Sequence, residues 1–357
     1  MTPERVRIGL LGCGNVGAAL VELIDGRRDA VAARTGLRLD VTRVAVRSLA
    51  KERPVELPEG VLTLDAAGLV VDPEVDVVVE VIGGVEPARE LVLAALKAGK
   101  PVVTGNKELL ANAGAELFAA AEQAGVDLLF EAAVAGGIPF IRPLRESLAG
   151  ERIDRIMGIV NGTTNYILTR MTEDGASYAD ALSEAQHLGF AERDPTADVE
   201  GHDAAAKAAI IASIAFGVRV VAGDVYFEGI SNITTADIDY AGKMGFVVKL
   251  LAIAEQHGAG RDGHAGEIAV RVHPAMVPAE HPLASVRDSF NAIFVEGGAV
   301  GDLMFYGRGA GGSPTASAVL GDVIDAALNR RRGSHATVGA LARGRIRPID
   351  EVETAYY

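Results

Sequence analysis

The chain opens with a short apolar segment that leads into a glycine-rich turn and then into a helix-like segment. Residues 5–12 read RVRIGLLG, residues 12–17 read GCGNVG, and AALVELID follows. This order predicts a dinucleotide-binding unit, because the glycines allow a tight turn, the approach of a diphosphate and close helix packing. The alternative is a chance glycine turn. The residues expected to contact the cofactor here are Gly12, Gly14, Asn15, Val16 and Gly17.

Strand-like and helix-like segments alternate through the first 150 residues. Strand-like segments occur at 5–12, around 40–48, and at 76–83, 100–105 and 126–134, with helix-like segments at 15–25, 87–98 and 108–124. Valine-rich strands that alternate with helices predict a parallel sheet covered on both faces. Residues 1–150 are therefore expected to form an α/β, doubly wound Rossmann-type domain.

The pattern changes after residue 150, where strands and helices predict a second, α+β domain over residues 151–306. A Gly-rich turn then precedes Ser313-Pro314 and a strongly apolar helix. We expect this helix, from about 307–330, to complete the first domain together with the C-terminal segment. Gly311 is expected to face the cofactor, although the turn is equally explained as a flexible entry to the helix.

Composition restricts the class of protein. The chain has 357 residues, a net charge of −14 and no basic block, so nucleic acid is not an expected partner. No apolar run is long enough to span a membrane, and the N-terminus lacks an apolar signal region, which favours a cytoplasmic location. The one cysteine, Cys13, lies in the glycine-rich turn, so neither a disulfide framework nor a thiolate metal site is expected.

An acidic segment precedes a single lysine in the second domain. Glu192, Asp194, Asp198, Glu200 and Asp203 all occur within twelve positions, ahead of Lys207. Pro195 and two glycines predict a shaped loop, and DAAAKAAIIASIAF predicts a helix that places Asp203 and Lys207 on one face. This arrangement favours a site that holds an ammonium-bearing substrate beside a proton-transfer group. The alternative is a solvated charged loop, which the apolar helix after Lys207 disfavours.

Two further positions in the first domain bear on the cofactor. Lys107 follows a predicted strand at the carboxyl end of the sheet, where open α/β sheets bind ligands, and it is expected near the nicotinamide. The alternative is an ordinary surface lysine, but the positive end of a helix dipole disfavours a lysine at a helix N-terminus. Arg47 and Ser48 follow the second strand and favour NADP over NAD, because arginine can bind a 2′-phosphate. The alternative is a surface arginine on a turn.

A dinucleotide site together with an acid-and-lysine site predicts hydride transfer to or from an amino-acid-like compound. The cofactor supplies the hydride chemistry, and the protein must bind, orient and move one proton. A phosphorylating aldehyde dehydrogenase needs a thiol nucleophile, and Cys13 belongs to the glycine-rich turn. Interconversion of an alcohol and an aldehyde is therefore the expected reaction class.

Several segments together resemble the homoserine dehydrogenase family. The central one is Ala185-x3-Gly-Phe-Ala-x2-Asp-Pro-x2-Asp-Val-x-Gly-x-Asp-x3-Lys207. Other similar segments, in the family's order, are GLLGCGNVG, GNKELLA, FEAAVAGGIP, GIVNGTTNYIL and GRGAGGSPTASAVLGD. The resemblance covers essentially residues 5–350. It implies the interconversion of L-homoserine and L-aspartate 4-semialdehyde with a nicotinamide cofactor, in the biosynthesis of threonine, methionine and isoleucine.

The resemblance also implies individual roles. Lys207 matches the catalytic lysine that donates a proton to the aldehyde, and Lys107 matches a second active-site lysine that contacts cofactor and substrate. Glu192 matches a substrate-binding carboxylate, and Asp198 and Asp203 match acids that hold the substrate amino group and orient the lysine. Thr163, with the Asn161-Gly162 backbone, matches a substrate loop.

FEAAVAGGIP matches a site for Na⁺ or K⁺, with the Glu131 carboxylate and the carbonyls of Val134, Gly136 and Ile138 as ligands. A structural turn in which Glu131 is paired elsewhere is the alternative. The resemblance further implies a homodimer formed through the second domain. It also places the chain with short forms that have neither an amino-acid-sensing domain nor a fused kinase, so threonine feedback is not expected.

Two other functions remain open at this point. One is a different two-domain NAD(P)-dependent oxidoreductase that acts on another hydroxy compound, such as a sugar alcohol. A neutral sugar would not need so many carboxylates, so the acidic segment disfavours it. The other is an NADP-binding regulator without catalysis, which the presence of both lysines and the acids disfavours.

Overall fold

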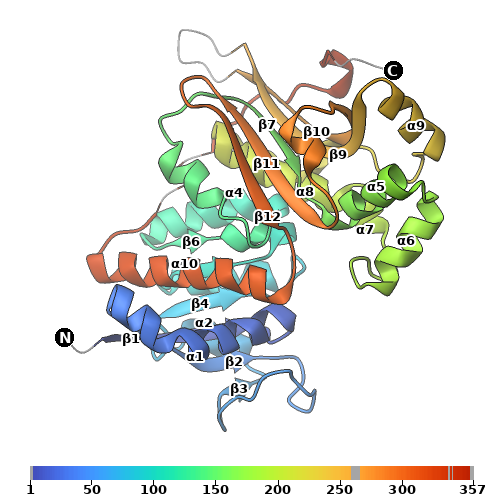
Figure 1. The fold of residues 1–357 in the computed structure, drawn as a ribbon. Helices are drawn as coiled ribbons and strands as arrows, with labels where there is room; N and C mark the ends of the chain where they lie inside the picture. The colour runs from blue at the N-terminus through green and yellow to red at the C-terminus, as the bar shows by residue number, and fades with distance from the viewer. Residues whose placement is uncertain (1–2, 259–265, 337, 340, 354–357) are drawn as a thin grey trace. The chain divides into compact units, whose positions relative to one another are not determined.

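The computed structural model describes residues 3–258, 266–336, 338–339 and 341–353. The chain divides into two compact units, Met1–Gly137 with Ala310–Ala340, and Ile138–Gly309 with Leu341–Tyr357. Each unit contains one six-stranded sheet, and Figure 1 shows the elements of both.

The sheet of the first unit is entirely parallel. Its strand order is β3-β2-β1-β4-β5-β6. The strands are β1 (Glu4–Leu11), β2 (Leu37–Ala45), β3 (Leu62–Thr63), β4 (Val77–Glu80), β5 (Val102–Thr104) and β6 (Leu128–Leu129). The helices are α1 (Asn15–Thr35), α2 (Ala66–Val71), α3 (Ala88–Lys97), α4 (Lys107–Ala124) and α10 (Gly312–Arg332), with a 3-10 turn at Glu131–Ala133. This order and the helical crossovers are those of a Rossmann fold, which confirms the predicted fold class.

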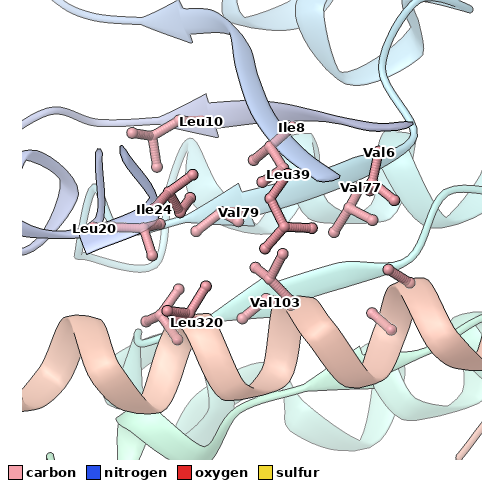
Figure 2. Packing of buried hydrophobic residues seen from close by; sticks show 14 of the residues in the cluster. Val6, Ile8, Leu10, Leu20, Ile24, Leu39, Val77, Val79, Val103 and Leu320 are labelled. Atoms are coloured by element: carbon pink, nitrogen blue, oxygen red, sulfur yellow. The ribbon is translucent and has the colours of Figure 1, made fainter. Parts of the chain in front are cut away.

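Aliphatic side chains from the strands and from two helices form the core of this unit. Val77, Val79 and Val103 are fully buried, as the run of valines in these strands predicts. Figure 2 shows them in the same core as Leu320, which lies on α10, a helix that is distant in sequence. Helix α10 also packs against α1, so the last long helix covers the sheet beside the first one.

The sheet of the second unit is mostly antiparallel, with strand order β12-β11-β7-β9-β10-β8; only the β10–β8 pair is parallel. The strands are β7 (Ile153–Ile159), β8 (Tyr226–Phe227), β9 (Phe246–His257), β10 (Glu267–Pro278), β11 (Phe290–Gly297) and β12 (Gly301–Arg308). The helices are α5 (Gly162–Asp174), α6 (Tyr178–His187), α7 (Thr196–Val199), α8 (His202–Phe216) and α9 (Thr235–Lys243). Short helical turns lie at Pro143–Ser147, Ala222–Asp224, Pro282–Ser285 and Ile349–Glu351. Helices α5, α8 and α9 pack on β9, and the predicted α+β class is confirmed.

The division between the units differs from the predicted boundary. It falls after Gly137 rather than at residue 150, and it assigns the C-terminal segment to the second unit. Isolated bridges pair Val218 with Ala342 and Ile268 with Ile346, so this segment lies along the second unit. Pairing between such distant residues leaves no periodic pattern in the sequence.

Within the described ranges, no helix is both long enough and apolar enough to cross a membrane.

Candidate functional site

The glycine-rich turn after β1 has the geometry of a diphosphate cradle. Gly12 has φ of +96°, and a Cβ there would lie 2.9 Å from Cγ2 of Ile82. A Cβ on Gly17 would lie 2.4 Å from the carbonyl oxygen of Gly12, so glycine is needed for helix packing. A Cβ on Gly14 would meet no atom within 4 Å. Gly14 caps α1 without a side-chain hydrogen bond, so the helix N-terminus faces open space that fits an anion.

A second glycine turn packs against the first one. Gly311 caps α10 with φ of +116°. A Cβ on the next residue, Gly312, would lie 3.2 Å from the carbonyl oxygen of Asn15. This contact places the start of α10 beside the start of α1, and it supports the prediction that Gly311 lies near the cofactor.

A buried carboxylate organises the carboxyl end of the sheet around Lys107. Glu80 ends β4 and is fully buried. Its Oε1 accepts from the peptide N–H of Ile82 at 2.8 Å, and its Oε2 accepts from the hydroxyl of Thr104 at 2.6 Å. The side-chain amide of Asn106 donates to Glu80 Oε1 at 3.4 Å, and Asn106 also caps α4, which begins at Lys107. Glu80 therefore fixes the loop that touches Gly12 and the turn that carries Lys107.

Glu80 was not among the predicted site residues, although a carboxylate at the end of a buried valine strand is a signal that could have identified it.

The loop after β2 is exposed and is tied down by one arginine. Arg47 and Ser48 are both exposed. The Arg53 guanidinium donates to the carbonyl oxygens of Ser48 at 2.5 Å and of Lys51 at 2.7 Å. Burial raises the pKa of the Cys13 thiol, and the positive charge of Arg53 opposes this shift. Arg53 thus holds the loop that carries Ser48 and acts electrostatically on the glycine-rich turn, and it was not among the predicted site residues.

The predicted acid-and-lysine site is a connected hydrogen-bond network in the second unit. Lys207 Nζ donates to Asp203 Oδ2 at 2.8 Å and to the carbonyl oxygen of Val160 at 2.7 Å. Asp203 is 8% exposed, and its Oδ2 also accepts from Asn161 Nδ2 at 2.9 Å. The same amide donates to Asp198 Oδ1 at 2.7 Å. Both Lys207 and Asp203 lie on α8, four residues apart, as the sequence predicts.

Asn161 has a larger part in this network than sequence analysis predicted. Its backbone alone was expected in the substrate loop, but its side chain joins the two acids and also caps α5. The amide therefore fixes the start of α5 to Asp198 and Asp203. The contacts span 37 and 42 positions, which is why no local pattern reveals them.

Asp198 and Thr163 form the adjoining surface of the site. Thr163 Oγ1 donates to the carbonyl oxygen of Phe190 at 2.7 Å and contacts Asp198 Oδ2 at 3.3 Å. Burial raises the pKa of the Asp198 carboxyl, and the negative charge of Asp203 acts in the same direction. Gly162 is the first residue of α5, where a Cβ would lie 2.7 Å from the carbonyl oxygen of Ser289.

The remaining acids of the segment have different surroundings. Glu192 is exposed, and its carbonyl oxygen accepts from the side chain of Gln186. Asp194 accepts from Thr196 at the start of α7, and Glu200 accepts from Ser231. The structure therefore brings Asp198, Asp203 and Lys207 together, whereas Asp194 and Glu200 stabilise the loop, which contains the short helix α7.

The predicted cation segment is a buried turn. Glu131 is 5% exposed and begins a 3-10 turn, and its peptide N–H donates to Asp322 Oδ2 at 2.8 Å. Val134, Gly136 and Ile138 are also buried. A single carboxylate with backbone carbonyls is an oxygen-rich donor set that fits a monovalent cation. The described residues contain no cluster of three or more His, Cys, Asp or Glu side chains that could hold a metal ion.

A Rossmann unit with an open diphosphate cradle, and a second unit with a partly buried lysine–carboxylate network, define the class of NAD(P)-dependent oxidoreductases. A family model described as homoserine dehydrogenase matches residues 139–324, and one described as its NAD-binding domain matches residues 12–131. The chain belongs to the homoserine dehydrogenase family, whose members are NAD(P)-dependent oxidoreductases that act on CH–OH donors.

The relatives are similar over nearly the whole chain. Homoserine dehydrogenase of Corynebacterium glutamicum is 59% identical over 331 residues, which are 93% of this chain and 74% of the relative. That of Mycobacterium tuberculosis is 53% identical over 355 residues, or 99% of this chain and 79% of the relative.

Solved structures agree with these relatives. A homoserine dehydrogenase from Thiobacillus denitrificans has a TM-score of 0.91 at 44% identity and covers 98% of this chain and 81% of its own. A hyperthermophilic archaeal homoserine dehydrogenase in complex with NADPH has a TM-score of 0.74 at 30% identity. The match covers 91% of this chain and 98% of that chain.

The family resemblance, the fold class and the enzyme class predicted from the sequence are therefore confirmed. The roles of individual residues, the monovalent cation, the preference for NADP, the homodimer and the cytoplasmic location stay predictions.

Proposed function

We propose that this chain interconverts L-homoserine and L-aspartate 4-semialdehyde, with Lys207 as the residue that donates and accepts the proton. The observation that carries this assignment is the network formed by Lys207, Asp203 and Asn161. An ammonium has three N–H donors. Two are directed at Asp203 and at the Val160 carbonyl oxygen, which leaves one for a substrate oxygen.

The nicotinamide cofactor supplies or removes the hydride, and the protein controls the proton and the orientation of the substrate. During reduction of the aldehyde, Lys207 donates a proton to the oxygen that becomes the hydroxyl group. During oxidation the same amine accepts it. Asp203 orients Lys207 through the 2.8 Å hydrogen bond from Lys207 Nζ to Asp203 Oδ2.

The substrate's amino group needs carboxylates, and the second unit provides them. Asp198 lies beside Thr163 and the start of α5, and we assign it to the substrate ammonium group together with Glu192. Gly162 and Thr163 then contact the rest of the amino acid. An amino-acid substrate explains the carboxylates, whereas a neutral sugar alcohol does not.

We also assign NADP as the preferred cofactor, held by the Gly12–Gly17 turn, Gly311 and Lys107. The exposed Arg47 and Ser48 would face the 2′-phosphate, on a loop that Arg53 holds in place. From the family resemblance alone we further propose a cytoplasmic homodimer, and Na⁺ or K⁺ bound by the oxygens of Glu131, Val134, Gly136 and Ile138.

The assignment is tested by following the absorbance of reduced cofactor with purified protein and homoserine, first with NADP and then with NAD. Turnover of homoserine with a higher kcat/KM for NADP supports the proposal. Turnover of a sugar alcohol but not of homoserine would overturn it.

Replacing Arg47 tests the cofactor assignment separately. Arg47→Ala should raise the KM for NADP by about tenfold, since one charge-assisted contact to a phosphate is lost, and leave the KM for NAD unchanged. Arg27→Ala, at an exposed position of α1, is the matched control. An unchanged ratio of the two KM values in Arg47→Ala would show that this arginine does not select the cofactor.

A further inference from the structure

A second lysine of the second unit is buried and donates hydrogen bonds to neutral groups. Lys249 lies on β9 and is 2% exposed. Its Nζ donates to Asn165 Oδ1 at 3.0 Å and to the carbonyl oxygen of Val286 at 2.5 Å. Burial lowers the pKa of this ammonium to about 8. A buried cation with neutral partners costs stability, and an apolar side chain at this position of the strand would avoid that cost.

Asn165, the partner of Lys249, holds a sharp turn of the chain. Its Nδ2 donates to the carbonyl oxygens of Asp288 at 2.9 Å, Phe290 at 3.2 Å and Val286 at 3.3 Å. Asp288 adopts φ of +53°, which is uncommon for a residue other than glycine. Because Lys249 donates to Oδ1, the amide can present only its NH₂ group to these carbonyl oxygens. Lys249 therefore sets the orientation on which the turn depends.

The turn held by Asn165 packs against the substrate loop. The carbonyl oxygen of Ser289, in the middle of this turn, packs closely against Gly162. A Cβ built on Gly162 would lie 2.7 Å from this oxygen. Asn165 is also one helical turn after Asn161, and its peptide N–H donates to the Asn161 carbonyl oxygen at 3.3 Å. A continuous set of contacts thus runs from Lys249 through Asn165 and residues 286–290 to the start of α5.

We propose that Lys249 is a positioning residue of the dehydrogenase site. Its ammonium orients Asn165, which holds residues 286–290 against the first turn of α5 and so fixes Asn161, Gly162 and Thr163. The inference rests on the proposed function, because that function assigns these residues to the substrate. Lys249 acts through Asn165 and does not touch the substrate itself.

The test compares Lys249→Met, Asn165→Leu and the double variant in the full chain. Each single variant should raise the KM for homoserine by about tenfold or more, while the dissociation constant for NADPH stays within about twofold. The double variant should be no worse than the more affected single variant, because residues that act as one unit are not additive. Lys243→Met is the matched control, since Lys243 is exposed at the end of α9, and it should change neither constant.

Three results would overturn the inference. The first is an unchanged KM for homoserine in a folded Lys249→Met protein. The second is an additive double variant. The third is a sign that Lys249 serves only general stability. This sign would be either an equal loss of homoserine and NADPH affinity, or failure to fold in both Lys249→Met and the donor-retaining Lys249→Gln. If the unchanged protein does not oxidise homoserine, the proposed function fails and the inference fails with it.

Discussion

At the scale of single residues, Asp198 shows how a requirement for binding opposes stability. Its carboxyl is partly buried, and this burial raises its pKa. The unfolded chain then loses this proton at a lower pH than the folded chain does, so the folded state is penalised as pH rises above about 3.8. A carboxylate retained under this penalty is suited to binding a cation, and we propose that this cation is the substrate ammonium group.

Asp198→Asn should therefore separate stability from substrate binding. The change keeps an acceptor for Asn161 and removes the partly buried charge, so the free energy of unfolding near pH 7 should be equal to or higher than that of the unchanged protein. The KM for homoserine should rise by about tenfold to 100-fold, because a charge-assisted contact is lost. Urea unfolding at a series of pH values should show the difference in stability appearing as pH rises above about 3.8 and then levelling off once Asp198 is ionised in the folded chain. A marked loss of stability at pH 7 in Asp198→Asn would contradict this account.

Glu80 is the buried carboxylate of the first unit whose hydrogen bonds can be tested in the same way. Glu80→Gln keeps the shape of the side chain but replaces one acceptor oxygen by a donor that faces N–H and hydroxyl groups. We expect a loss of about 1–3 kcal/mol in the free energy of unfolding and weaker NADPH binding. Urea unfolding and a fluorescence titration with NADPH measure the two effects. Glu90→Gln, at an exposed position of α3, is the control, and equal behaviour of the two variants would show that Glu80 organises nothing.

At the scale of elements, two glycines of the same turn are expected to behave differently. Gly17→Ala places a Cβ 2.4 Å from the Gly12 carbonyl oxygen, so it should reduce both stability and NADPH affinity. Gly14→Ala meets no protein atom within 4 Å and has an ordinary φ of −86°. It should leave the unfolding midpoint unchanged and weaken only cofactor binding, because the methyl group occupies space expected for the diphosphate.

Thermal unfolding and NADPH titration of both variants distinguish these roles. Loss of stability in Gly14→Ala, or unchanged NADPH affinity in that variant, would show that the open space at the start of α1 is not the diphosphate site.

Also at the scale of elements, the sequence predicted those features that depend on local pattern. The valines of β4 and β5, the glycine turn after β1 and the i,i+4 pair of Asp203 and Lys207 were all predictable, because burial and helix geometry repeat at short spacing. Arg53 and the side chain of Asn161 were not, because their partners depend on how loops meet in the folded chain. Glu80 does have a local signal, a carboxylate at the end of a buried valine strand, but its partners at Ile82, Thr104 and Asn106 are set by the fold. The pairing of Ile346 with Ile268 was missed for the same reason.

At the scale of the whole molecule, each unit has its own core and its own part of the chemistry. The first unit offers an anion cradle and Lys107 at the carboxyl end of a parallel sheet. The second contains Lys207, which the Asp203 carboxylate holds and which we propose as the proton-transfer group. Changes in one unit should therefore affect the binding of homoserine more than that of the cofactor, or the reverse.

The role of Lys207 is the central claim, and the kinetics of Lys207→Ala test it most directly. The amine is the group assigned to proton transfer, so kcat for homoserine oxidation should fall by about 10²-fold to 10⁴-fold or more. The dissociation constant for NADPH should stay unchanged, and the exposed Lys243→Ala should retain full activity. If Lys207→Ala retains a kcat within about tenfold of the unchanged protein, the proton must move through another group, and the account given for this site is wrong.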